Sequence, residues 1–193
     1  LLLRLMPIVM EEGVFAVHGG TAINLFLMDL PRLSVDIDLT YIPLAERNQS
    51  LEAINQHLKS ISEKAKKTFK GMHIVPKYDI CKLLCEYRGK QVKVEVNQTK
   101  RGLVGGEAIT MPLSDKAQEE FGLYCEANIV PQTQLYGGKI AAALSRQHPR
   151  DLFDVKYMEL PMEDCREGLI FNLLGSDRPI HESFSPRLID QRE

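Results

Sequence analysis

The chain has 193 residues, 44% of them hydrophobic, and its 24 basic and 26 acidic side chains give a net charge of −2. These values predict one globular domain of ordinary size, or such a domain with a small helical annex, and the net charge alone indicates no partner. The apolar opening, interrupted by Arg4 and Pro7, is too short to span a bilayer and lacks a signal-peptide cleavage site. Four cysteines without C-x-x-C spacing predict reduced thiols rather than a metal site, so we expect a cytoplasmic protein.

The first forty residues alternate between helical and extended patterns. A helix is expected over residues 1–12, followed by a short strand at 14–18. Residues 21–29 have helical character, and Pro31 ends that helix because proline cannot continue it. Residues 34–41 then predict a strand.

The middle of the chain predicts one long helix and a hairpin. Ser50 is the expected cap of a helix whose apolar residues recur at helical spacing until Gly71 ends it. Residues 78–87 and 91–97 read as two strands joined by a glycine turn. A short strand is expected at 109–113.

The last third of the chain is predicted to be helical. Helices are expected over residues 134–146, 150–158 and 163–174. We therefore expect two parts: an α/β core at 1–115 that carries the metal carboxylates, and a mainly helical C-terminal portion at 116–193.

Two aspartates give the clearest chemical signal. Because side chains alternate along a strand, Ser34, Asp36 and Asp38 project from one face while the residues between them face the core. Paired carboxylates suit Mg²⁺, which fills its other positions with water and phosphate oxygens. Glu95 supplies a third metal ligand if its strand pairs with theirs. The pattern favours nucleotidyl transfer, and acids that serve solubility alone are the alternative.

Gly19 and Gly20 open the helix that follows the first predicted strand. Glycines let the backbone approach a phosphate closely, and the amides at a helix start attract an anion. With Thr21, Arg32 and Ser34 they are the expected nucleotide-binding residues. The motif is not a P-loop, and a tight turn beside a surface arginine remains the alternative.

A second cluster falls in the predicted C-terminal helices. Lys139 and Arg146 are seven residues apart, so they share one helix face from which they can reach a triphosphate. Asp151 and Asp154 are neighbours on the next helix. Ion pairing of Arg150 with Asp154 is the alternative role for this cluster.

Basic residues are concentrated in one segment. Residues 59–101 hold twelve lysines and arginines and only four acids, a net charge of +8. Such a segment suits a polyanion, and a solvated helix face is an equally good interpretation.

The motifs GGTAINLFLMDLPRLSVDIDL, VKVEVN and RDLFDV, with the lysine–arginine pair, together resemble the AbiEii/AbiGii nucleotidyltransferase-like toxin family. The resemblance covers roughly residues 14–186. It implies an α/β (α+β) fold of the DNA polymerase β-like nucleotidyltransferases, a mixed β-sheet flanked by helices and followed by a helical C-terminal portion. It implies that Asp36, Asp38 and Glu95 are catalytic metal acids. Lys139 and Asp151 match the family's C-terminal residues for nucleotide handling and activity.

The resemblance also implies a function. Members are toxins of toxin–antitoxin or abortive-infection systems, and some add nucleotides to the 3′ end of tRNA. We therefore expect Mg²⁺-dependent transfer of a nucleoside monophosphate from an NTP to RNA, tRNA above all, with a cognate antitoxin among the partners that the family allows. Modification of a protein hydroxyl, NTP binding without turnover and a plain interaction domain are the alternatives.

Overall fold

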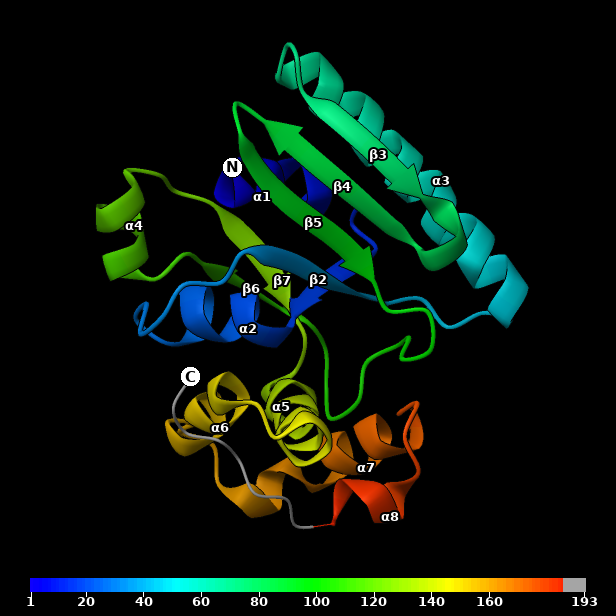
Figure 1. The fold of residues 1–193 in the computed structure, drawn as a ribbon, viewed down its shortest axis with the longest axis vertical. Coiled ribbons are helices and arrows are strands. Elements are labelled where there is room, and N and C mark those ends of the chain that lie inside the picture. The colour runs from blue at the N-terminus through cyan, green and yellow to red at the C-terminus, as the bar shows by residue number, and fades with distance from the viewer. Residues whose placement is uncertain (186–193) are drawn as a thin grey trace. The chain divides into compact units, whose positions relative to one another are not determined.

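The computed structural model describes residues 1–185, which divide into two compact units (Figure 1). The first comprises Leu1–Gly102 and Ala108–Ile129, and the second comprises Leu103–Glu107 and the chain from Val130 onward. None of the helices in the described part of the chain is long and apolar enough to cross a membrane.

A mixed seven-stranded sheet forms the centre of the first unit, in the order β3-β4-β5-β2-β1-β7-β6. The pairs β2–β5 and β1–β7 are parallel, and the other neighbours are antiparallel. This confirms the predicted fold class, a mixed sheet with flanking helices. The strands are β1 Phe15–His18, β2 Asp36–Tyr41, β3 His73–Lys77, β4 Lys82–Tyr87, β5 Lys90–Val96, β6 Ile109–Pro112 and β7 Glu126–Ile129.

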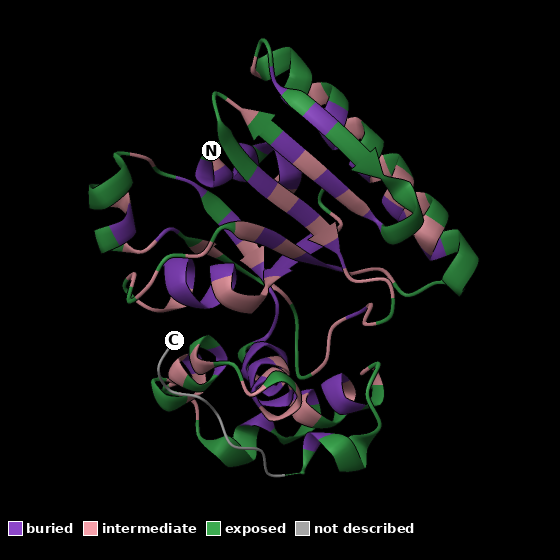
Figure 2. Ribbon diagram, in the orientation of Figure 1, coloured by how far each residue is buried: buried purple, intermediate pink, exposed green. Residues whose placement is uncertain are grey.

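One face of this sheet is apolar and is covered by two helices. Buried and more exposed residues alternate along β4 and β5 (Figure 2). The buried side chains, which include Leu83 and the valines of β5, point to one side of the sheet, and Leu84 points to the other. The ring of Phe15 in β1 lies edge-on to that of His57 in the long helix, which places the helix on this apolar face. The helices and helical turns of the first unit are α1 Leu2–Met10, α2 Gly19–Ala22, the π-helical turn η1 Ile23–Leu27, α3 Arg47–Thr68, the 3-10 turn η2 Tyr78–Ile80 and α4 Asp115–Phe121.

A carboxylate holds α1 and α3 together. Glu12 accepts hydrogen bonds from His57 Nδ1 and Ser60 Oγ, both at 2.7 Å, and from Lys64 Nζ at 2.9 Å. Burial would raise the pKa of Glu12, but these hydrogen bonds outweigh burial and lower it. The ionised carboxylate therefore fixes the end of α1 against the long helix.

Several element boundaries differ from the predictions. Ser50 does not cap α3, which begins at Arg47; its hydroxyl donates to the Ala45 carbonyl instead. Residues 78–80 form a 3-10 turn before the strand β4. The edge strand β3 was not predicted, because Ile74 is its one buried residue and Pro76 interrupts its strand pattern.

The second unit is helical in its described residues. Its central helix α5 packs against α7 so closely that a Cβ on Gly137 would lie 2.3 Å from the backbone of Gly168. The division falls after Ile129, later than the predicted boundary after residue 115, because β7 pairs with β1 and β6 and belongs to the sheet. The helices and turns are α5 Gln132–Arg146, α6 Pro149–Lys156, η3 Met162–Cys165, α7 Arg166–Leu174 and α8 Ile180–Ser183.

Candidate functional site

The three predicted metal acids lie on neighbouring strands of the first unit. Asp36 and Asp38 project from β2 on the face opposite the apolar core, with the buried Ile37 between them. The parallel pairing of β2 with β5 sets Asp38 directly beside Glu95. The two strands therefore pair, as the prediction of Glu95 as a third acid required.

Two lysines share this acidic face. Lys93 stands beside Asp36 in the β2–β5 register, and its Nζ lies 3.1 Å from Asp36 Oδ2 and 3.2 Å from Glu95 Oε2. Lys82 of β4 lies 3.1 Å from Glu95 Oε2. Both lysines belong to the basic segment, and neither was predicted as a site residue. The signal that points to Lys93 is its place two residues before Glu95, on the same side of an alternating strand.

The donor set suits a hard divalent cation, although the side chains as placed do not enclose one. Carboxylate oxygens are the ligands that Mg²⁺ prefers. Within residues 1–185, no three His, Cys, Asp or Glu side chains are arranged so that they could hold a metal ion together. Asp36 and Asp38 are the residues that would hold Mg²⁺, while Glu95 is engaged by the two lysines.

Asp38 is an acid of this site whose pKa is shifted by its surroundings. Burial raises its pKa, and the charges of Asp36 and Glu95 add to that effect, whereas His18 and Lys93 oppose it. His18 is its direct neighbour on the antiparallel strand β1. From this position the imidazole of His18 can orient the Asp38 carboxylate.

The glycine pair lies against these functional groups. A Cβ on Gly19 would lie 3.0 Å from Asp38 Oδ2, and Gly19 has a φ of +71°, which favours glycine. A Cβ on Gly20 would lie 3.0 Å from a guanidinium nitrogen of Arg32 and 3.3 Å from Ser34 Oγ. Gly19 is therefore favoured by its backbone conformation and by close approach to a carboxylate, and Gly20 by close approach alone.

A hydroxyl network ties the glycine turn to β2. Thr21 Oγ1 lies 2.8 Å from Ser34 Oγ, and the Thr21 hydroxyl also donates to the carbonyl of Asp36. Asn24 Nδ2 donates to the Gly20 carbonyl at 2.8 Å. The structure thus brings the predicted residues of the first unit together at one site.

The second unit contains a buried ionic cluster. Lys139 Nζ on α5 lies 3.0 Å from Asp151 Oδ1 and 3.0 Å from Asp154 Oδ2 on α6. Lys139, Asp151 and Asp154 are 6%, 4% and 0% exposed, whereas Arg146 reaches Asp151 from a more exposed position. In this arrangement Lys139 joins two helices, and its charge is matched within the unit.

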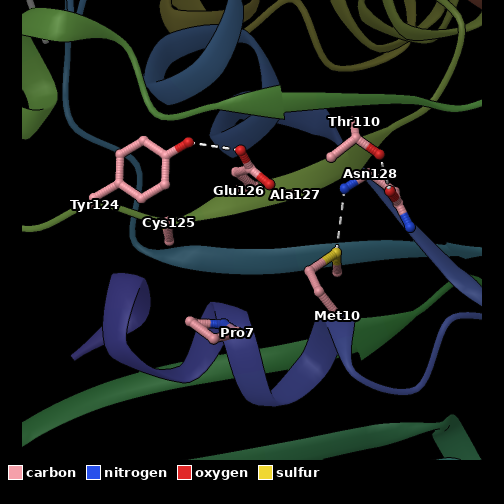
Figure 3. Close-up of a pocket in the computed structure, with 8 residues that line it drawn as sticks. All are labelled: Pro7, Met10, Thr110, Tyr124, Cys125, Glu126, Ala127 and Asn128. Atoms are coloured by element: carbon pink, nitrogen blue, oxygen red, sulfur yellow. Dashed lines mark hydrogen bonds between the residues drawn. The ribbon is translucent and has the colours of Figure 1, made fainter.

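A pocket of about 380 Å³ opens elsewhere on the first unit, between α1 and the strands β6 and β7 (Figure 3). Pro7 and Met10 line it from the helix, and Glu126 accepts a hydrogen bond from Tyr124 at its rim. Its lining contains no lysine or arginine among the described residues. The pocket therefore lacks the groups that bind a triphosphate.

Comparison with known proteins gives one family and one set of weak structural matches. The family model described as nucleotidyl transferase AbiEii toxin, Type IV TA system, matches residues 1–167. The solution structure of the antibiotic-resistance factor ANT(2″)-Ia is similar at 16% sequence identity and a TM-score of 0.38, covering 95% of this chain and 87% of that one. Comparison with curated proteins gives no significant match.

Proposed function

The chain belongs to the AbiEii family of nucleotidyltransferase toxins, and from this membership we propose that it transfers a nucleoside monophosphate from an NTP to RNA. The 3′ end of tRNA is the proposed acceptor and Mg²⁺ the proposed cofactor. Family membership confirms the prediction made from the motifs, and with it that the chain is a nucleotidyltransferase. We further propose that it acts in the cytoplasm beside a cognate antitoxin.

One observation carries this proposal. The glycine turn, Arg32 and Ser34 meet the carboxylates of Asp36 and Asp38 at a single place on the sheet. An anion-binding turn beside paired carboxylates is the combination that a metal-bound triphosphate requires. A nucleotide-binding turn alone would not require the two acids.

Each residue has a definite task in this site. Arg32 provides a planar guanidinium that can pair with two phosphate oxygens, and the absence of a side chain at Gly20 lets phosphate approach the backbone. The Thr21–Ser34 contact fixes the turn against β2. Asp36 and Asp38 would hold Mg²⁺, which when bound neutralises negative charge that develops on the transferring phosphoryl group.

The basic segment supports a nucleic-acid acceptor. The exposed lysines of α3 lie on the side of the helix that faces away from its buried residues, and so away from the sheet. They form a lysine row that can neutralise successive phosphates. Its members are Lys59, Lys66 and Lys67, and the exposed Lys70 follows just after the helix ends.

The decisive experiment supplies each α-labelled NTP with Mg²⁺, purified tRNA, total RNA and total protein. We expect label in RNA, with tRNA as the main product, and loss of that label in Asp36→Ala and Asp38→Ala. Asp79→Ala is the matched control, because Asp79 is an exposed aspartate of the same unit. Label in protein alone would favour hydroxyl modification, and NTP binding without any labelled product would favour a non-catalytic module.

A further inference from the structure

We propose that Lys93 is an internal counter-cation that occupies Asp36 in the resting enzyme and competes with the divalent metal for it. Metal then binds weakly to the free protein and firmly only together with the nucleotide. The inference rests on the proposed function in one respect, that Asp36 is a metal-binding acid. It adds a positioning residue to the site and explains how metal and nucleotide arrive together.

The position of Lys93 follows from strand geometry. In the parallel register of β2 and β5, Lys93 stands beside Asp36, and strand alternation puts it on the same face as Glu95. Its Nζ is shared between Asp36 Oδ2 at 3.1 Å and Glu95 Oε2 at 3.2 Å. Both backbones are held in the centre of the sheet, so the contact is built into the fold.

The neighbouring Lys82 does not pair with Asp36. Lys82 lies 3.1 Å from Glu95, and among the ion pairs of residues 1–185 it meets no other carboxylate. Glu95 therefore has two ammonium partners, whereas Asp36 has Lys93. The positive charge that opposes a metal at Asp36 comes mainly from one side chain.

Competition follows from distance and charge. Mg²⁺ binds carboxylate oxygen at about 2.0–2.1 Å, so an ion on Asp36 would lie within a few ångströms of the ammonium that now bonds the same carboxylate. Two cations at that separation repel each other unless further negative charge is present. The triphosphate of an NTP supplies that charge, and the displaced Lys93 ammonium then lies beside a polyanion.

The test measures binding of Mn²⁺ alone, without nucleotide or acceptor, by calorimetry or by the loss of free Mn²⁺ resonance. We expect Lys93→Met, which keeps the apolar stem, to bind Mn²⁺ about tenfold more tightly than the unaltered protein, a change of about 1.4 kcal/mol. Lys82→Met, which removes an ammonium from Glu95 only, should change the affinity by less than about threefold. Lys93→Arg keeps the charge and should bind Mn²⁺ as weakly as the unaltered protein.

Unchanged or weaker Mn²⁺ binding by Lys93→Met overturns the inference, as does equal tightening in Lys82→Met. If Lys93→Met fails to fold, Lys93→Gln replaces it, and circular dichroism reports the fold. The outcome is separate from the fate of the proposed function. If Lys93→Met binds Mn²⁺ more tightly but the unaltered protein transfers no nucleotide, the counter-cation role stands and the proposed reaction is wrong. If the unaltered protein transfers nucleotide but Lys93→Met does not bind Mn²⁺ more tightly, the proposed reaction stands and the counter-cation role is wrong.

Discussion

Gly19 and Asp38 are in direct contact, because a Cβ at Gly19 would lie 3.0 Å from the Asp38 carboxylate. A side chain at Gly19 would therefore require the Asp38 carboxylate to move. Backbone conformation adds a second demand at the same residue, since its φ of +71° favours glycine.

Comparing two glycine variants can separate the loss of stability caused by a strained backbone from the loss of activity caused by moving Asp38. Gly19→Ala and Gly13→Ala both place alanine at a positive φ, and each should lose about 1–2 kcal/mol of stability. Gly13 has no atom within 4 Å of the added Cβ, so Gly13→Ala should keep its activity. Gly19→Ala should displace Asp38 and lower nucleotidyl transfer at least about tenfold. Equal activity in the two variants would contradict a role for the contact.

Asp38→Asn should lower transfer while leaving the fold at least as stable at neutral pH. The raised pKa means that the folded state disfavours the ionised acid, so removing the charge relieves a cost that exists at high pH. The melting-temperature difference should shrink as pH falls through the raised pKa of the folded acid toward the ordinary aspartate pKa of 3.8, because the folded protein takes up the proton first. Transfer should fall about a hundredfold or more.

Thermal unfolding from pH 3 to pH 8, with labelled-NTP assays at neutral pH, checks both parts. Asp79→Asn is the control for a simple change of surface charge. A large fall in the melting temperature of Asp38→Asn at neutral pH would mean that the carboxylate stabilises the fold.

Lys139→Met should destabilise the second unit by about 3–5 kcal/mol, because it leaves the buried carboxylates of Asp151 and Asp154 without their ammonium partner. Lys156→Met, at an exposed position on α6, should cost less than about 1 kcal/mol. Chemical denaturation of both variants gives the comparison. If Lys139→Met keeps its stability but loses NTP binding, its main role is nucleotide handling, as the family resemblance implies.

Glu12→Gln should lower stability by about 1–3 kcal/mol at neutral pH, because His57, Ser60 and Lys64 lose the ionised acceptor that they share. The pKa of Glu12 is lowered in the fold, so its contribution to stability is fully present above the ordinary glutamate pKa of 4.5 and is lost as pH falls through the lowered pKa. The difference between variant and unaltered protein should therefore narrow in acid.

Glu11→Gln provides the matched control for Glu12→Gln. The Glu11 side chain is 60% exposed, and its Oε2 lies 3.2 Å from Lys64 Nζ. Loss of this exposed ion pair should lower the stability little at any pH. Melting curves of the three proteins at pH 3, 4, 5 and 7 give the result. A constant difference across this range would show that packing, not charge, holds the end of α1.

The acid-bearing strand was predictable because its signal is local. Alternation along 34–41 sets Asp36 and Asp38 on one face, and the glycine pair marks the turn before the helix. The partnership of Lys93 with Asp36 was not predictable from one strand alone. It depends on the parallel register between β2 and β5, which brings together residues 57 positions apart.

Other elements were missed because their sequence patterns are weak. β7 spans only Glu126–Ile129, and α4 spans Asp115–Phe121 with Ala117 as its one buried residue. Short elements with few buried residues give little periodicity to detect. The buried state of Lys139 was also missed, since a helix face that can reach a phosphate can equally face another helix.

Both outer strands of the seven-stranded sheet contain a proline, Pro76 in β3 and Pro112 in β6. Proline carries no backbone N–H, so neither edge presents an unbroken row of donors to an incoming strand. Lys77 adds a charge beside the first of these prolines. The prolines at the two edges of the sheet thereby disfavour its growth by edge-to-edge association.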